Sequence, residues 1–280
     1  MNTDQSDLMT PPPAPPSITR THIVDVLRQA FDALPEVLAA WEGGSAAFGR
    51  VDAWSDVDAV AVVADESIDA TFAAAEQALE TLSPIVQVHP VAGTSGFRQR
   101  FYRLRDAGEF AVVDLVLIRR SDPLRFREVE LHGRGPVWKD PQGLLVDAHL
   151  DAAADAASAR ERVDALASAF AMFQHLVTKD RLRGRAVDAL AFYQAYTMRP
   201  LIEALRLLHA PHTRVFGPRY VGRDLPAPAV RELERLSFVH DLADLAVQHA
   251  AACRWFDACL ARLQASGPGS GLDGLTRPPG

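Results

Sequence analysis

The spacing of hydrophobic residues changes near residue 150. Before that point, apolar runs of strand length alternate with segments in which apolar residues recur every three or four positions. From about Asp151 onward, the three-to-four spacing continues through several long segments. The pattern predicts an α+β domain over residues 18–150, with a mixed sheet and flanking helices, followed by an all-α helical bundle over residues 151–265.

The first half is predicted to contain two helices and a series of strands. The helices are expected at 18–34 and 65–82, ended by Pro35 and by Ser83-Pro84. Strands are expected at 37–41, 57–64, 85–91 and 109–118, with a loosely alternating segment at 97–104. A short helix around 123–130 and a small strand at 137–138 complete this half.

The second half is predicted to consist of helices joined by short connecting segments. Helices are expected at 151–178, at 187–209 with Pro200 inside it or at a break, from about residue 228, and at 241–264. Residues 211–223 are expected to form a loop. The proline-rich residues 1–17, and residues 266–280 with five glycines and three prolines, are expected to be disordered tails.

Charge and cysteine content narrow the class of protein. The formal net charge is −7, which argues against a general nucleic-acid-binding protein. Acidic residues dominate residues 1–150, whereas residues 151–265 carry a small excess of basic ones. The two cysteines form no zinc or disulfide pattern, and no apolar run approaches the roughly 20 residues of a membrane span. A cytoplasmic protein without a membrane partner is therefore expected.

The stretch from Gly43 to Asp58 carries the strongest chemical signal. A small-residue turn, Gly43-Gly44-Ser45, precedes two aspartates, Asp56 and Asp58, at the start of an apolar strand. The period of two in a strand places both carboxylates on one face, where they repel each other unless a divalent cation neutralises them. A glycine turn lets backbone N–H groups approach phosphates. The alternative is an ordinary surface turn that leads into a core strand.

This stretch resembles the signature of the polymerase-beta-like nucleotidyltransferase superfamily. The matching residues are Gly44-Ser45, Gly49-Arg50 and Ser55-Asp56-Val57-Asp58. The resemblance implies the fold of that superfamily and transfer of a nucleoside monophosphate from a nucleoside triphosphate to a hydroxyl acceptor. It also implies that Asp56 and Asp58 hold Mg²⁺, with two ions expected. Nucleotide contacts are implied for Gly44, Ser45, Arg50 and Ser55.

Asp114 interrupts the most apolar predicted strand and needs a compensating partner there. By the resemblance it is the third carboxylate of the metal site. A structural salt bridge to one of Arg98 to Arg105 is the alternative. Four basic residues near 179–185 lie between two predicted helices, and Lys179 and Arg185 are candidates for contact with the triphosphate. A solvated helix junction explains them equally well.

The sequence does not identify the acceptor molecule. Chain size and the helical second half resemble small-molecule adenylyltransferases such as the aminoglycoside enzymes, which implies ATP as donor and a small-molecule acceptor. The carboxylate that activates the acceptor is not singled out among Glu109, Glu128, Glu130 and Asp188. Nucleotidylation of a protein or of a transfer RNA, as in toxin-like members, and a non-catalytic nucleotide-binding protein are the alternatives.

A second segment, residues 209–226, has an unusual composition for a loop. It contains Phe216-Gly217-Pro218-Arg219-Tyr220 and, three residues further on, Arg223-Asp224-Leu225-Pro226. Arg219 and Arg223 are candidates for contact with an anion or a substrate. Tyr220 and Pro226 are expected to fix the conformation of the loop.

Overall fold

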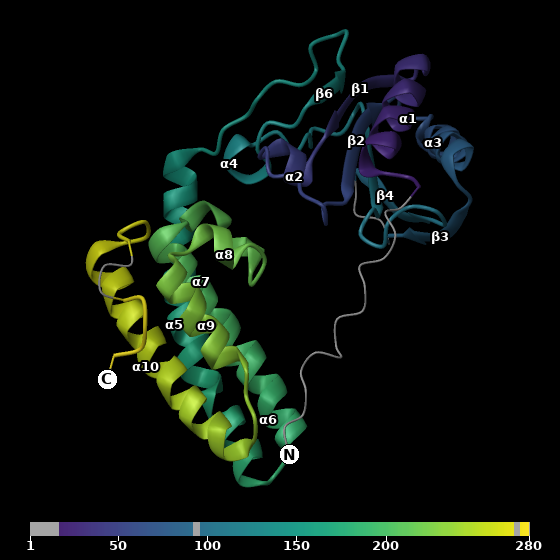
Figure 1. Ribbon diagram of the computed structural model, residues 1–280. Helices are drawn as coiled ribbons and strands as arrows, with labels where there is room; N and C mark the ends of the chain where they lie inside the picture. Colours follow the sequence, from purple (N-terminus) through teal and green to yellow (C-terminus); the bar gives the residue numbers. More distant parts are fainter. Residues whose placement is uncertain (1–16, 92–95, 272–274, 280) are drawn as a thin grey trace, which may run out of the picture. The chain divides into compact units, whose positions relative to one another are not determined.

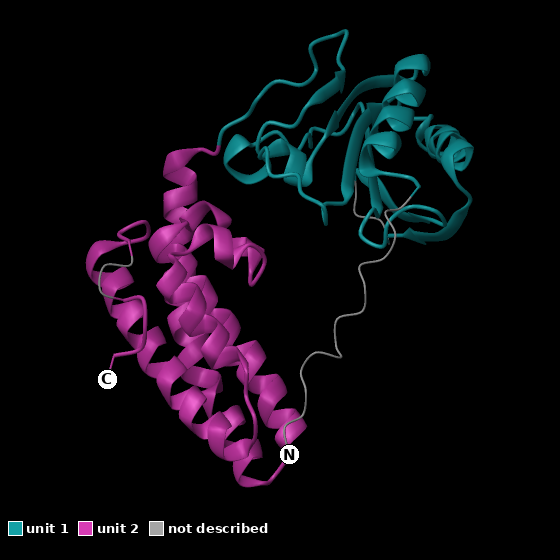
Figure 2. Ribbon diagram, viewed as in Figure 1, with its two compact units in different colours: residues 1–149 teal, residues 150–280 magenta. Residues whose placement is uncertain are grey.

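The computed structural model describes residues 17–91, 96–271 and 275–279. The chain divides into two compact units, residues 1–149 and 150–280 (Figure 2). The first unit contains a six-stranded sheet with helices and the second is helical (Figure 1), so the expected fold class is confirmed. The tail expected over residues 1–17 lies, except for Ser17, outside the described residues.

The sheet of the first unit is mixed. Its strands, in chain order, are β1 (Val37–Glu42), β2 (Val57–Val63), β3 (Ile85–Pro90), β4 (Phe97–Leu104), β5 (Val113–Arg119) and β6 (Val137–Lys139). Their order across the sheet is β3-β4-β5-β2-β1-β6. The central strands β2 and β5 run parallel, and each of the other neighbouring pairs is antiparallel.

Two helices pack with one face of this sheet. Helix α1 (Arg20–Ala33) begins after Thr19, whose hydroxyl caps the backbone N–H of His22, and α3 (Ile68–Leu82) follows β2. Their apolar faces join alternate strand residues in the larger core of this unit. A smaller cluster on the sheet includes Trp41, Val60 and Val62. Since Asp58 precedes Val60 by two strand positions, its side chain lies on the face of this smaller cluster.

Short helices differ from the sequence expectation at two places in the first unit. The predicted turn at Gly43-Gly44 continues into a single helical turn, α2 (Gly44–Ala47). The helix expected around 123–130 is wrong for most of its length, because only α4 (Val129–His132) is helical. Phe126 has a positive φ of 50°, a backbone conformation that a right-handed helix excludes.

The second unit is a bundle of long and short helices. They are α5 (Ala152–Leu182), α6 (Ala186–Phe192), a π-helical segment (Tyr193–Met198), α7 (Arg199–His209), a 3₁₀ segment (Pro211–Phe216), α8 (Val221–Asp224), α9 (Ala227–Ser237) and α10 (Leu242–Ser266). The π-helical segment ends at Met198 and α7 follows it with Pro200 as its second residue, so the helix expected over 187–209 continues past the proline.

The loop expected over residues 211–223 is wrong in part, because these residues include the 3₁₀ segment and most of α8.

Beyond α10, Gly269 and Gly271 lie in the segment for which the sequence predicts disorder, and both donate backbone hydrogen bonds of 2.8 Å to carbonyls of α7. In the part of the chain that the structure describes, every helix is too short or too polar to cross a membrane.

Candidate functional site

The three aspartates singled out by the sequence lie at the centre of the sheet. Asp56 directly precedes β2, Asp58 is its second residue, and Asp114 is the second residue of β5. Because β2 and β5 are parallel neighbours in register, Asp58 lies directly opposite Asp114. Two carboxylates that are 56 positions apart in the chain are thereby placed side by side on one sheet face.

The glycine turn is joined to the same strand. The backbone N–H of Gly43 donates to the carbonyl of Asp58 at 2.8 Å. Gly44 has a positive φ of 50°, and a Cβ at this position would lie 1.7 Å from Oδ2 of Asp58 and 2.4 Å from its Cγ. The carboxylate of Asp58 therefore occupies the space that any side chain at position 44 would need.

This close approach gives a direct test. We expect Gly44→Ala to displace the Asp58 side chain and to lower the free energy of unfolding by roughly 1–3 kcal/mol, because the methyl group collides with the carboxylate and left-handed φ is costly for alanine. The matched control is Gly43→Ala, whose Cβ would meet its nearest atom at an ordinary 3.6 Å. Urea denaturation of both variants measures the difference. Equal stabilities would contradict the close packing of Gly44 against Asp58.

Burial and mutual repulsion make this aspartate cluster costly for the folded chain. Burial, the charges of Asp56 and Asp114, and a hydrogen bond with Asp56 raise the pKa of Asp58 to about 7. Burial also raises the pKa of Asp114, although a hydrogen bond from Gln99 opposes the shift. A site that holds carboxylates at such a cost suits a ligand of positive charge.

Gln99 holds the third aspartate in place. Its side-chain Nε2 lies 2.7 Å from Oδ1 and 2.9 Å from Oδ2 of Asp114. Gln99 comes from β4, where it pairs with Val116 of β5, so the two strands fix the orientation of the carboxylate. The sequence does not single out Gln99, since only the pairing of β4 with β5 brings it beside Asp114.

Arg20 connects the site to the helical face of the sheet. Its Nε donates to the backbone carbonyl of Asp56 at 2.9 Å, and its guanidinium forms an ion pair with Glu42, which is buried at the end of β1. This ion pair was not among the sequence-based predictions. A cation in the first turn of a helix opposes the helix dipole, and that anomaly was a usable signal.

The remaining predicted residues of the first unit lie in the connection between the glycine turn and β2. Ser45 has a buried hydroxyl without a hydrogen-bond partner in the described residues, an arrangement that leaves it available to a ligand. Ser55 instead shares hydrogen bonds of 2.9 Å with Asp52. Arg50 is exposed, and its guanidinium lies 5.4 Å from the centre of the Phe48 ring.

The chemistry of these residues suits a hard divalent cation. Three carboxylates supply the oxygen ligands that Mg²⁺ prefers, and a cation would relieve the repulsion that raises the pKa of Asp58. Gly44 lets the Asp58 carboxylate lie against the turn, and Ser45 has a buried hydroxyl without a partner in the described residues. Among residues 17–91, 96–271 and 275–279, no three His, Cys, Asp or Glu side chains already stand in a metal-holding arrangement. Mg²⁺ binding at Asp56, Asp58 and Asp114 thus stays a prediction.

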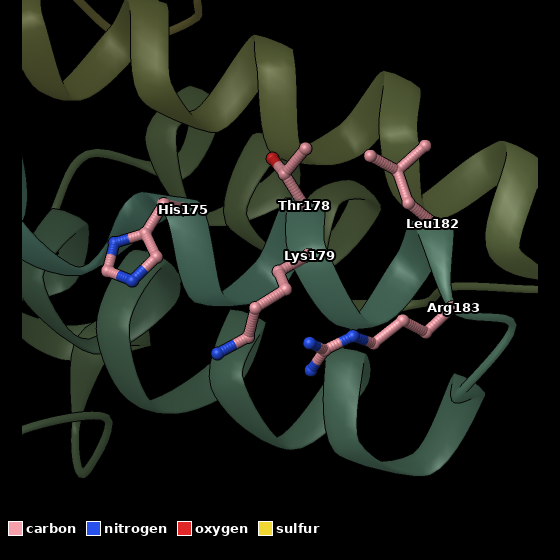
Figure 3. A pocket seen from close by; sticks show the side chains of 5 residues that line it. All are labelled: His175, Thr178, Lys179, Leu182 and Arg183. Carbon is pink, nitrogen blue, oxygen red and sulfur yellow. The ribbon is translucent and has the colours of Figure 1, made fainter.

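Lys179 and Arg185 belong to the second unit. Lys179 lines an open hollow of about 580 Å³ together with His175, Thr178 and Leu182 of α5 and with Arg183, which follows that helix (Figure 3). Arg185 lies 3.5 Å from Asp180, a buried carboxylate that Arg183 approaches at the same distance. The predicted contacts of Lys179 and Arg185 with a triphosphate stay predictions.

None of the four candidate bases is set apart by its surroundings. Glu128 lies 3.8 Å from His132, and Glu130 lies 2.7 Å from His149. Glu109 is exposed in the first unit and Asp188 is exposed in the second. The acceptor-activating carboxylate therefore stays open among them.

Comparison with known proteins gives loose structural matches. No family model and no curated protein matches the sequence. Solved structures that it resembles include an aminoglycoside 6-adenyltransferase from Bacillus subtilis, at 14% identity and a TM-score of 0.35, covering 88% of this chain and 91% of that one. Two Helicobacter pylori proteins each align at 12% identity and a TM-score of 0.26. The first is described as a candidate nucleotidyltransferase, and the alignment covers 87% of this chain and 96% of that one. The second is JHP933, for which the alignment covers 92% of this chain and 97% of that one. Similarity this distant says nothing about activity, which has to be judged from the site.

Proposed function

We propose that this protein is a Mg²⁺-dependent nucleotidyltransferase that moves a nucleoside monophosphate from a nucleoside triphosphate, with ATP as the expected donor, to a hydroxyl group of a small molecule. The observation that carries the proposal is the packing of the glycine turn against the aspartate cluster. The carboxylate of Asp58 occupies the space that a side chain at position 44 would fill, and Asp58 lies in register with Asp114. The glycine turn and the aspartate cluster thus share one place in the fold.

The roles of the residues follow from their positions. Asp56, Asp58 and Asp114 would hold two Mg²⁺ ions, which supply positive charge to the phosphate oxygens. The backbone of Gly44 and the free hydroxyl of Ser45 bind the β- and γ-phosphates. Gln99 keeps Asp114 oriented, and Arg20 holds the backbone at Asp56. Arg50 and Ser55 are proposed to contact the nucleotide from the connection before β2.

The transfer exchanges one phosphorus–oxygen bond for another. The acceptor oxygen forms a bond to the α-phosphorus, and the bond from that phosphorus to the bridging oxygen breaks, so pyrophosphate leaves with the bonding electrons. The acceptor loses its proton to a carboxylate. Asp114 is one candidate for this role, since it lies beside Asp58 on the neighbouring strand, and Glu109, Glu128, Glu130 and Asp188 are the others.

Thermal unfolding tests the proposal without knowledge of the acceptor. The full chain is heated with ATP, GTP, CTP or UTP, each with and without Mg²⁺. We expect one nucleotide to raise the melting temperature only when Mg²⁺ is present, since a ligand at 100 times its Kd stabilises the folded state by about 2.7 kcal/mol. The Asp56→Asn/Asp58→Asn variant should lose the shift.

The matched control removes the same charge elsewhere in the first unit. Asp32 and Asp69 are exposed aspartates of α1 and α3, and the Asp32→Asn/Asp69→Asn variant should keep the full nucleotide shift. The proposal fails if no nucleotide shifts the wild type, or if the Asp56→Asn/Asp58→Asn variant responds as strongly as the control.

A further inference from the structure

The loop between α7 and α9, residues 211–226, is shaped by a buried arginine. Arg206 of α7 is fully buried, and its Nε donates to the carbonyl of Gly217 at 2.9 Å. Its Nη1 donates to the hydroxyl of Thr213 at 2.7 Å and pairs with Asp224, while Nη2 donates to the carbonyl of Arg219. One side chain thus holds the loop at four separate points.

The tip of this loop exposes an aromatic ring in a strained backbone conformation. Tyr220 has a φ of 62° and its side chain is 46% exposed. The guanidinium groups of Arg219 and Arg223 lie 5.0 and 4.6 Å from the centre of its ring, and Arg219 also donates to the tyrosine hydroxyl at 2.8 Å. A bulky residue with left-handed φ is rare and concentrates at functional places. Both guanidinium groups therefore lie within about 5 Å of the centre of one exposed ring.

The loop carries more positive than negative charge. Within it, Arg214 pairs with Asp155 of α5, and Arg223 pairs with Asp224, which also pairs with the buried Arg206 of α7. In the part of the chain that the structure describes, Arg219 pairs with no carboxylate and its side chain is exposed. The Arg219 guanidinium is therefore a positive charge on a fixed loop of a chain whose net charge is −7, and it is suited to bind an anion.

We infer that the Arg219–Tyr220–Arg223 cluster binds a phosphate group of a small phosphorylated ligand. A guanidinium presents its N–H donors in a planar fork that matches two oxygens of a phosphate, and stacking against a ring fixes that plane in advance. Arg219 is the principal donor, Arg223 adds a second charge, and Tyr220 orients both. The phosphate can belong to a polyphosphate or to a phosphate monoester. This site lies entirely in the second unit and does not depend on the proposed function.

Isothermal titration of the full-length protein in EDTA tests the inference, because Mg²⁺-dependent binding at the aspartates is then suppressed. The probes are inorganic pyrophosphate and glucose 6-phosphate at constant ionic strength. We expect Arg219→Gln to weaken binding by at least about tenfold, since hydrogen bonds to charged groups are the stronger class. The control Arg231→Gln removes the same charge from an exposed position on α9 and should bind as the wild type does.

A second variant distinguishes weaker binding from a loss of folded structure. Tyr220→Gly removes the ring but accepts the left-handed φ, so it should keep the wild-type circular dichroism spectrum and bind each probe several times more weakly. Stronger binding of pyrophosphate identifies a polyphosphate ligand, and equal or stronger binding of glucose 6-phosphate identifies a monoester. The inference is overturned if neither probe binds the wild type, or if Arg219→Gln binds as tightly as Arg231→Gln.

Discussion

We expect the Asp58→Asn variant, free of nucleotide and metal, to be more stable than the wild type at pH 8. The Asp58 carboxyl has its pKa raised to about 7 by burial and by Asp56 and Asp114. Its ionised form therefore costs the folded state on the order of 2–4 kcal/mol. Asparagine keeps the shape of the side chain, carries no charge and donates a hydrogen bond that Asp56 accepts. The same variant should lose the Mg²⁺-dependent nucleotide shift, so stability and binding change in opposite directions.

The pH dependence of this gain follows from the direction of the pKa change. A raised pKa means that the folded chain binds the proton more tightly than the unfolded chain, so the wild type is penalised as pH rises from about 4 through about 7. The advantage of Asp58→Asn should vanish near pH 4 and be complete at pH 8.

Urea denaturation followed by tryptophan fluorescence measures this, because three of the four tryptophans lie in the first unit. The control Asp32→Asn removes an exposed charge and should stay within about 0.5 kcal/mol of the wild type at both pH values. A gain that is equal at pH 4 and pH 8, or no gain at either, would show that burial and the neighbouring carboxylates do not penalise ionised Asp58 as described.

We expect Arg206→Met to lower the free energy of unfolding of the second unit by roughly 3–5 kcal/mol, the usual cost of removing one member of a buried ion pair. Arg206 is fully buried and donates to Gly217, Thr213, Arg219 and Asp224. Burial alone would raise the pKa of Asp224, but hydrogen bonds from Arg223, Arg206 and Thr213 outweigh it and lower that pKa. Methionine preserves much of the volume but leaves these acceptors without their donor.

Circular dichroism during urea denaturation follows this loss, because the second unit is helical. The control is Arg199→Met in the same helix, where the arginine is exposed and a change of less than about 0.5 kcal/mol is expected. Arg206→Lys should fall between the two, since an ammonium group keeps the charge but cannot span the four acceptors. A loss below about 1 kcal/mol for Arg206→Met would mean that the loop is held by other contacts.

Part of the candidate site was accessible from the sequence. Asp56 and Asp58 lie in a local pattern, a turn of small residues before an apolar strand, and the period of two is enough to place them on one face. The requirement for glycine at position 44 was also readable in outline, although the sequence linked it to phosphate and the structure links it to the Asp58 carboxylate. Their roles in binding Mg²⁺ and nucleotide remain predictions.

The partners of these aspartates could not be found in the same way. Gln99 reaches Asp114 because β4 pairs with β5, and Glu42 meets Arg20 because β1 ends near the start of α1. The Arg219–Tyr220–Arg223 cluster depends on Arg206, a residue more than ten positions earlier on another helix. No local pattern points to Gln99 or Arg206, whereas Arg219 and Arg223 could be named as candidates from the composition of their segment.

By itself, the sequence determined the division into an α+β half and a helical half, most strand positions, and the aspartate pair. These depend on the periodicity of neighbouring residues, which the backbone imposes over a few positions. The tertiary structure decided which strands are neighbours, and so placed Asp58 beside Asp114, Gln99 beside Asp114, and Arg206 beneath its loop. Strand order and burial are set by the free energy of a whole unit, to which residues far apart in the chain contribute together.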